Sequence, residues 1–325
     1  METEPPKAEP PKRKRRWFQF SLRTLMIFTV ICALAIAWVG RWTDQKRKER
    51  EAVDALVKLG GHVSFAYQQT GGSGTPPGPA WLRKLVGDNA FSEVEEVSFI
   101  GDTEYVHGGG SNVSDEALVN LTALAATKRL ELLITPKITD AGLANVRGLS
   151  QLDRLAIQGT QLTDVGLQNL LGLPQIEHLL LADNRITDAG LTKLAGLTDL
   201  RELSFRESGV TDAALVNLES LERLEDLSLR GGQFTNAGLA HLKGLSRLKS
   251  LNLYGNKITD AGLGNFKNLT QLQTLVLDEN DITDAGLAHF RGLTQLKTLS
   301  LVGTKVTDAG VTGLQAAMPK CRIIH

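Results

Sequence analysis

Carboxylate side chains recur along this sequence at a spacing that could serve either metal binding or helix capping. One Asp or Asn follows another every 24 residues, at Asp140, Asp164, Asp188, Asp212, Asn236, Asp260, Asp284 and Asp308. Aligned carboxylates can ligate Ca²⁺, whereas an Asp before a short helix is an N-cap that accepts hydrogen bonds from free backbone N–H groups. Each of these residues precedes an apolar spacing typical of a helical turn, so we expect N-caps rather than a calcium site.

Few other residues stand in a pattern that could do chemistry. The six histidines, at His62, His107, His178, His241, His289 and His325, belong to no H-E-x-x-H or other metal-ligand spacing. The Gly-rich stretch HGGGSN at 107–112 lacks the Lys-Ser/Thr that completes a phosphate-binding loop, and no G-x-S-x-G motif occurs. The sequence therefore predicts no enzyme activity, no metal site and no cofactor.

The same spacing of 24 residues organises the whole second part of the chain. Units begin at Ile138, Leu162, Ile186, Val210, Phe234, Ile258, Ile282 and Val306, and an earlier unit begins at Val113. Counted from that first residue, apolar side chains occupy positions 1, 6, 9, 12, 15, 18 and 20 of each unit. Positions 18 and 20 alternate as in a strand, and positions 6 and 9 have the spacing of a helical turn. This repetition predicts a solenoid, in which neighbouring coils bury each other's apolar faces.

The unit pattern L-x-x-L-x-L-x-x-(N/T)-x-I, followed by TDAGL, resembles the leucine-rich-repeat family; LKSLNLYGNKI at 248–258 and LQTLVLDENDI at 272–282 carry it. The resemblance covers about residues 90–325 and implies an α/β solenoid, with a parallel concave sheet and short helices on the convex side. The TDAGL variant is similar to cysteine-poor bacterial repeats, and also to repeats that follow F-boxes, although no F-box-like segment precedes it here. The whole chain resembles bacterial single-pass membrane proteins that bear such repeats.

The resemblance also implies a role for position 23 of each unit. In the family, an Asn at this position bridges successive turns through its side-chain amide. Asn184, Asn256 and Asn280 match this pattern. The positions that depart from it are Thr160, Ser208, Gly232 and Thr304. We therefore expect the asparagine ladder to be interrupted.

An apolar stretch near the N-terminus predicts a membrane anchor. Residues 1–21 are Pro-rich and basic, and we expect them to be disordered. Residues 22–42 form an apolar run that has aromatic residues at both ends and is long enough to cross a bilayer as one transmembrane helix. A cleaved signal peptide and a buried helix of a soluble protein are the alternatives. Seven Lys/Arg precede the charge-free stretch Thr24 to Gly40 of this run and five follow it by residue 50, which favours a repeat domain on the non-cytoplasmic side.

The remainder of the chain divides at residue 112. We expect residues 43–112 to be a linker and an N-terminal cap with irregular repeats, including a helix followed by a strand near 51–68 and a strand that buries Val94, Val97 and Phe99. Residues 113–325 form the predicted leucine-rich-repeat domain, which ends in a C-terminal cap with a final strand. Cys32 and Cys321 have no close partner in sequence, and we expect Cys321 to be buried as a small apolar residue.

A candidate partner-binding surface follows from the implied concave sheet. Position 21 of successive units brings together Arg206, Arg230, Tyr254 and Asp278, because neighbouring strands lie about 4.8 Å apart. Arg and Tyr are enriched at the energetic centres of protein interfaces. The alternative is a solvated, charge-balanced face, in which nearby carboxylates neutralise the arginines; these are Glu202, Glu207, Glu225 and Asp226.

The charge distribution and the missing catalytic motifs limit the classes of function that the chain can have. The net charge is zero, yet twelve of the 36 Lys/Arg lie within residues 1–50, so the body of the chain is acidic. An acidic body argues against nucleic-acid binding, and a basic head favours an anionic membrane surface. We expect a membrane-anchored protein that binds an unknown protein partner. A self-associating structural protein of the envelope and a soluble adaptor resembling F-box-associated repeats are the alternatives.

Overall fold

The computed structural model describes the chain except residues 1–21, 70–74, 102–112, 207–208 and 232. Two compact units are present, Met1–Lys48 and Glu49–His325. The predicted N-terminal tail, the HGGGSN stretch, Glu207, Ser208 and Gly232 lie outside the described residues. The site considered below belongs entirely to the second unit.

The helices and strands of the described residues are as follows. The α-helices are α1 (Leu22–Lys58), α2 (Ala66–Gln69), α3 (Ala80–Val86), α4 (Asp115–Leu118), α5 (Asp140–Leu143), α6 (Asp188–Leu191), α7 (Asp260–Leu263) and α8 (Asp308–Ala317). The strands are β1 (His62–Phe65), β2 (Val94–Ile100), β3 (Arg129–Leu133), β4 (Arg154–Gln158), β5 (His178–Ala182), β6 (Glu202–Arg206), β7 (Asp226–Leu229), β8 (Ser250–Asn252), β9 (Thr274–Val276), β10 (Thr298–Ser300) and β11 (Arg322–Ile324). The 3₁₀-helices are η1 (Asp88–Phe91), η3 (Val119–Ala123), η4 (Ala144–Gly148), η5 (Gly166–Gly172), η6 (Leu194–Gly196), η7 (Asp212–Leu218), η8 (Gly238–Gly244), η9 (Gly264–Asn268) and η10 (Asp284–Gly292).

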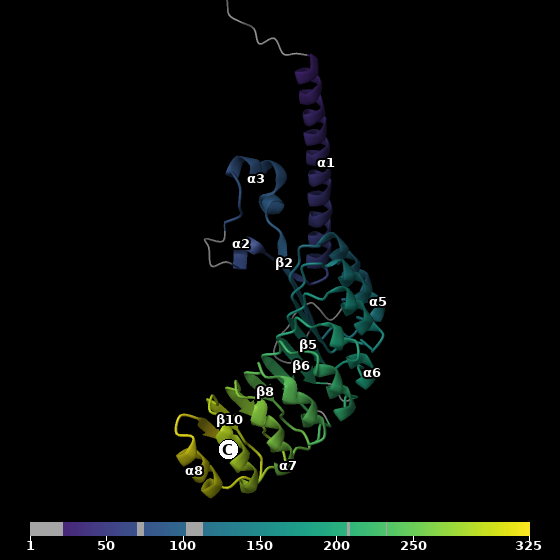
Figure 1. The fold of residues 1–325 in the computed structure, drawn as a ribbon. Coiled ribbons are helices and arrows are strands. Elements are labelled where there is room, and N and C mark those ends of the chain that lie inside the picture. Colours follow the sequence, from purple (N-terminus) through teal and green to yellow (C-terminus); the bar gives the residue numbers. More distant parts are fainter. Residues whose placement is uncertain (1–21, 70–74, 102–112, 207–208, 232) are drawn as a thin grey trace, which may run out of the picture. The chain divides into compact units, whose positions relative to one another are not determined.

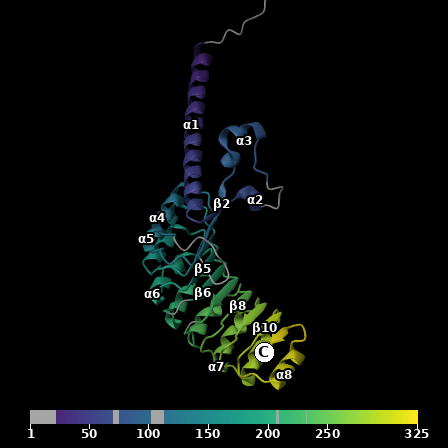
Figure 2. The same ribbon diagram turned by 180° about the vertical axis from the view of Figure 1, so that it is seen from behind.

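Within the described residues, eleven strands form one sheet in the order of the chain. From β2 onward every neighbouring pair is parallel, and the register keeps equal repeat positions side by side, as in Leu203↔Leu227 and Leu251↔Leu275. The coils of the second unit follow one another along an arc, with the strands on its concave side and the helices on its convex side (Figures 1 and 2). The predicted α/β solenoid with a parallel concave sheet is therefore confirmed.

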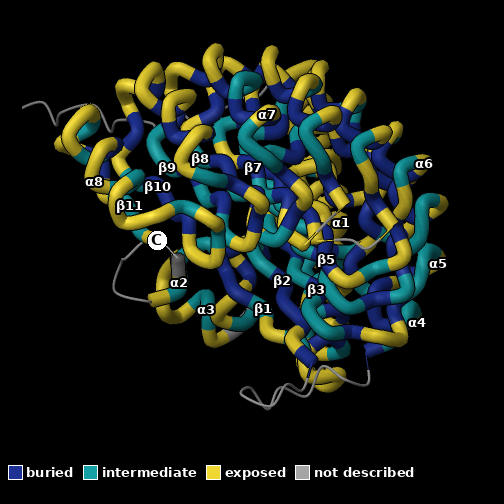
Figure 3. Tube along the Cα trace, turned by 90° about the horizontal axis from the view of Figure 1, so that it is seen from below, coloured by how far each residue is buried: buried dark blue, intermediate teal, exposed yellow. Residues whose placement is uncertain are grey.

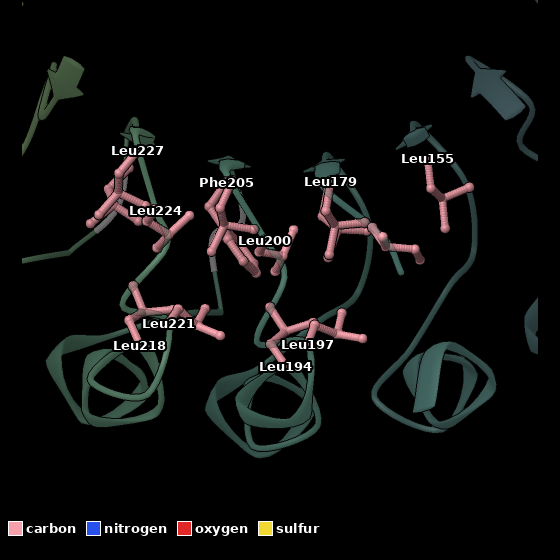
Figure 4. Close-up of a cluster of buried hydrophobic side chains, with 14 of the residues drawn as sticks. Leu155, Leu179, Leu194, Leu197, Leu200, Phe205, Leu218, Leu221, Leu224 and Leu227 are labelled. Carbon is pink, nitrogen blue, oxygen red and sulfur yellow. The ribbon is translucent and has the colours of Figure 1, made fainter. Parts of the chain in front are cut away.

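The core fills the space between the strands and the helices of each coil. In the unit that begins at Ile258, all seven apolar positions are fully buried: Ile258, Leu263, Phe266, Leu269, Leu272, Leu275 and Leu277. The buried segments line the inside of every coil (Figure 3). Leucines of three adjacent coils, among them Leu179, Leu200 and Leu224, project from strand and helix toward one another (Figure 4). Because these side chains belong to one continuous cluster, each coil completes the interior of the next.

Most of the convex helical residues are in 3₁₀ rather than α conformation. The apolar positions 6, 9 and 12 recur every three residues, as in Leu239, Leu242 and Leu245, which are all buried. A 3₁₀-helix has three residues per turn, so a spacing of three places these side chains along one line facing the core. Four of the described 3₁₀-helices, η3, η4, η6 and η9, follow a single α-turn that opens with Asp-Ala-Gly-Leu or a related sequence, as in α5 and η4.

The prediction that the repeated Asp is the N-cap is wrong. The N-cap is the preceding Thr: the Oγ1 of Thr139 accepts a hydrogen bond from the Ala141 N–H at 3.2 Å. The Asp instead bonds to the Thr of the next coil. The Thr163 N–H donates to Asp140 Oδ1 at 2.8 Å, and the Thr163 hydroxyl donates to Asp140 Oδ2 at 2.6 Å. The same link follows Asp115, Asp164, Asp188, Asp212, Asp260 and Asp284. We call this the Asp–Thr ladder.

The Gly of the repeated TDAGL motif makes room for this ladder. A Cβ at Gly190 would lie 2.3 Å from Asp164 Oδ1, and one at Gly286 would lie 2.3 Å from Asp260 Oδ1. Gly gives the carboxylate of the preceding coil close room at these steps, and the next Leu enters the core; Ala214 stands at the same position in one unit, where the Asp188–Thr211 link is kept. The motif thus repeats because Thr caps the turn, Asp bonds to the following Thr, Gly accommodates the preceding Asp, and Leu packs inside.

Asn236 alters one step of the ladder. Its Oδ1 still accepts the Thr259 N–H at 3.0 Å, but its Nδ2 now donates to Thr259 Oγ1 at 2.7 Å. In the other described units the Thr hydroxyl donates to a carboxylate and its oxygen caps the helix, but Thr259 makes no side-chain cap bond to α7. An amide in place of a carboxylate therefore reverses the direction of one bond and costs the capping bond of the next helix.

The turn that follows each strand, just before the Asp–Thr ladder, makes a second kind of link between coils. The Asn280 Nδ2 donates to Leu253 O of the preceding coil at 2.8 Å, and Asn256 Nδ2 donates to Leu229 O at 2.8 Å. Asn184 Nδ2 donates to Ile157 O at 3.1 Å, so all three predicted bridges are confirmed. Thr304 donates within its own turn, to Leu301 O. The interruption expected at this position is therefore confirmed, because the bridging depends on the long Asn side chain.

The N-terminal elements also agree with the sequence. The helix α1 continues to Lys58, and its last turns place Ala52 and Leu56 in the core of the second unit. The strand β1 follows and pairs antiparallel with β2, whose Val94, Val97 and Phe99 are buried. At the other end β11 pairs with β10, and Cys321 is buried as expected. Burial raises the pKa of the Cys321 thiol.

Candidate functional site

The concave face of the sheet presents one set of side chains from every strand. In each strand positions 18 and 20 point into the core, so positions 17, 19 and 21 lie on the opposite, concave face. The register places Glu202 beside Asp226 and Ser204 beside Ser228. Repeat positions on this face therefore form rows that run across the strands.

The row at position 21 contains the four residues predicted from the sequence. Arg206 is the last residue of β6, and Arg230 directly follows β7. Tyr254 and Asp278 lie two residues after the ends of β8 and β9. Backbone bonds continue the parallel pairing beyond the strands: the Gly231 N–H donates to Tyr254 O, and the Gly255 N–H donates to Asp278 O, both at 2.9 Å. These bonds keep Arg230, Tyr254 and Asp278 next to one another.

Arg230 and Tyr254 form the most distinctive pair in this row. The guanidinium carbon of Arg230 lies 5.2 Å from the centroid of the Tyr254 ring, within the range of a cation–π contact. The Tyr254 residue is 38% exposed, whereas the phenylalanines of the repeats, such as Phe234 and Phe266, are buried. Among the described residues, no carboxylate lies within salt-bridge distance of Arg230. The pair offers a flat surface and a free positive charge to a partner.

Arg206 is held by a residue that the sequence reasoning missed. Its guanidinium lies 3.4 Å from Asp183 Oδ1, and the Gln158 amide donates to Asp183 Oδ2 at 3.1 Å. Asp183 occupies position 22, where φ is positive in every described unit and where Gly159, Gly231, Gly255 and Gly303 stand elsewhere. A residue with a Cβ is unfavourable in this conformation. An Asp or Glu at a position that otherwise selects Gly is the signal that could have identified Asp183.

Two of the carboxylates expected to neutralise the arginines, Glu202 and Glu225, are engaged elsewhere, and Glu207 lies outside the described residues. Glu202 lies 2.8 Å from His178 Nδ1 and 3.9 Å from Arg154. Glu225 bonds to Lys249 and lies 3.3 Å from Arg201, and the Lys249 bond lowers the pKa of the Glu225 carboxyl. Asp278 is used by the fold, since its Oδ1 accepts the Val302 N–H at 2.9 Å. Among the described residues, Arg230 therefore keeps an unpaired positive charge at the surface, whereas Arg206 is paired with Asp183.

The repeated carboxylates, which the sequence offered as possible metal ligands, are used for hydrogen bonds between coils. Both oxygens of each ladder Asp accept bonds from the N–H and hydroxyl of the following Thr. Within the described part of the chain, no group of three His, Cys, Asp or Glu side chains has a geometry that could hold a metal ion. The ladder is thus a structural element of the convex-side turns.

The comparisons with known proteins point to one repeat family. A leucine-rich-repeat family model matches residues 222–282 and 246–306, and a second such model matches residues 174–195. Among solved structures, the chain is similar to an internalin C2 from Listeria monocytogenes, at 26% identity and a TM-score of 0.47, over 64% of this chain and 88% of that one. Another internalin of that species is 25% identical, with a TM-score of 0.46, over 63% of this chain and 69% of that one. No curated protein matches the chain.

Proposed function

Because the chain is a leucine-rich-repeat protein, we propose that it is a single-pass membrane protein that binds another protein through the concave face of its sheet. Leucine-rich repeats generally serve protein–protein interaction. The observation that carries the proposal is the row formed by Arg206, Arg230 and Tyr254, which is exposed on a rigid sheet and is not used by the fold. Rigid strands hold such side chains in place at little entropic cost on binding.

The membrane part of the proposal rests on α1. The helix has 37 residues and contains a window of 18 residues with a mean hydropathy of 2.2, none of which is buried. Leu25, Ile27, Phe28 and Ile36 are all more than half exposed. A helix of this length and composition suits a bilayer crossing. With seven basic residues before Thr24 and five between residues 41 and 50, we infer a repeat domain on the non-cytoplasmic side.

The test captures the partner with the full-length protein in its own membranes. Proximity labelling from the repeat domain is compared between the wild type, an Arg206→Ala/Tyr254→Ala double variant and a convex-face Lys243→Ala/Lys267→Ala control. The proposal expects the concave variant to lose most of the labelled partner and the control to keep it. Equal labelling by all three proteins would rule out the concave site.

Two further measurements separate the alternatives. A carbonate wash leaves a transmembrane protein in the membrane pellet, whereas it releases a peripheral adaptor. Sedimentation of the full-length chain in detergent distinguishes a monomer from a self-associating structural protein. We expect retention in the pellet and a monomer whose sedimentation does not depend on concentration.

A further inference from the structure

The charges over the centre of the concave face are paired, with two exceptions. Across β6, β7 and β8 the described charged residues with ion-pair partners are Arg201, Glu202, Arg206, Glu225 and Lys249. Asp226 and Arg230 have no partner of opposite charge within 4.0 Å among the described residues. Both belong to one coil: Asp226 begins β7, and Arg230 directly follows it.

The two unpaired groups are arranged as a dipole along the strand. Asp226 and Arg230 lie four positions apart in the sequence, which corresponds to about 13 Å in an extended strand. Ser228 lies midway between them on the same face, with Ser204 and Asn252 beside it in the register. These small polar side chains leave the space between the two charges open to another chain.

The surroundings of Asp226 favour a cationic group from outside. Partial withdrawal from water raises the pKa of the Asp226 carboxyl, and the neighbouring charges of Glu202 and Glu225 raise it further. Hydrogen bonding from Ser250 and the charge of Lys249 act in the opposite direction. Like charges directly opposite each other in a sheet are destabilising. A basic side chain of a partner would relieve this repulsion and gain an ion pair.

We propose that β7 is the contact strand for an extended segment of the partner protein, which carries a basic and an acidic side chain four residues apart. The basic group pairs with Asp226 and the acidic group with Arg230. An extended partner fits because its own rise of about 3.3 Å per residue reproduces the 13 Å spacing. Same-face positions on an α-helix are about 10.5 or 16.5 Å apart, seven or eleven residues along, and do not match it. This inference rests on the proposed concave binding site and specifies its partner.

The experiment selects peptides from a random nine-residue phage library on the full-length protein in detergent. The baits are the wild type, Arg230→Glu, Asp226→Lys, the double swap Asp226→Lys/Arg230→Glu, and Lys243→Glu on the convex side as a control. The wild type and the control enrich peptides with opposite charges four positions apart. Arg230→Glu enriches two basic residues at that spacing, and Asp226→Lys enriches two acidic ones. The double swap enriches opposite charges in reversed order along the peptide.

Measured affinities of synthetic peptides give the contribution of each charge pair to binding. A peptide selected on the wild type should bind Arg230→Glu about tenfold or more weakly, since a like-charge contact replaces an ion pair. The melting temperature of each variant is measured first, and Arg230→Gln replaces Arg230→Glu if the latter does not fold. Selection without charge pairing, or the same peptides on every bait, overturns the inference. If labelling still depends on Arg206 and Tyr254 in that case, the concave site stands and only its partner chemistry falls.

Discussion

Two stretches of each repeat unit follow different rules. At positions 2 to 5, where the chain enters the convex helix, nearly every coil repeats the Asp–Thr ladder, with few departures such as Asn236 and Ala214. At positions 21 and 22, where the strand ends, the residues vary: position 21 changes from Gln158 to Arg206 to Tyr254, and position 22 is Gly, an acid or an Ile under the same positive φ. The repeated stretch couples the coils to each other, whereas the varied stretch changes the surface without changing the fold.

Two carboxylates express the same contrast. Bonds from the Thr307 hydroxyl and N–H lower the pKa of the Asp284 carboxyl in the ladder. Withdrawal from water raises the pKa of the Asp226 carboxyl on the concave face. A lowered pKa means that the ionised group favours the folded state, and a raised pKa means that it opposes folding. The charge of Asp284 in the ladder therefore serves stability, and the concave charge of Asp226 is available for binding.

The largest expected effect on stability comes from placing a charge in the hydrophobic core, on which the ladder and the concave surface both depend. Leu275→Asp should lower the free energy of unfolding by more than about 4 kcal/mol, because it buries an unpaired charge between coils. Val276→Asp, one residue along on the concave face, should cost about 1 kcal/mol or less. Urea unfolding of the full-length protein measures both. Similar losses for the two variants would show that the core does not lie on one side of the sheet.

The next effect concerns one step of the ladder. Asp260→Ala removes the acceptor for the Thr283 N–H and hydroxyl, which should lower the free energy of unfolding by about 1–3 kcal/mol. Asp308→Ala is the matched control, because the Asp308 carboxylate contacts the terminal His325 rather than a Thr of a following coil, and the change should cost less than about 0.5 kcal/mol. Thermal unfolding followed by circular dichroism measures the difference. A neutral Asp260→Ala would mean that the ladder contributes no stability.

A smaller effect tests the one irregular step. Asn236→Asp should let Thr259 donate to a carboxylate and cap α7, which should raise the free energy of unfolding by about 0.5–1 kcal/mol. Asp260→Asn makes the reverse change in the next coil and should lower it by a similar amount. The melting temperatures of the two variants should shift in opposite directions. Shifts of the same sign would show that the amide and the carboxylate are equivalent here.

The smallest effect is a difference in pH dependence. Asp284→Asn should lower stability at pH 7, and the deficit should shrink as the pH falls below about 4, because the ionised Asp284 stabilises the fold only above its lowered pKa. Asp226→Asn should raise stability at pH 7, and the gain should shrink as the pH falls through the raised pKa of Asp226. Melting temperatures of both variants between pH 3 and pH 7, each relative to the wild type, measure these trends. If the stability differences of the two variants changed with pH in the same direction, the opposite roles of Asp284 and Asp226 would be contradicted.

The repeat period and the apolar positions predicted the solenoid, because seven buried side chains per unit depend only on local spacing. The predicted role of the repeated Asp was wrong for a physical reason. The sequence shows that a carboxylate lies near the start of a helix, but it does not show which coil supplies the hydrogen-bond donors to that carboxylate. The position-21 row was found from the register alone. Asp183 was missed because its importance follows from a positive φ, which the sequence does not state. The free charges of Asp226 and Arg230 could not be predicted, because pairing across strands decides them.

The most direct measurement compares the urea unfolding of Asp260→Ala and Arg230→Glu side by side in the full-length protein. We expect a loss of about 1–3 kcal/mol for the ladder variant and a change within about 0.5 kcal/mol for the concave variant. A stable ladder variant beside a destabilised Arg230→Glu would contradict the separation of a structural ladder from a binding surface.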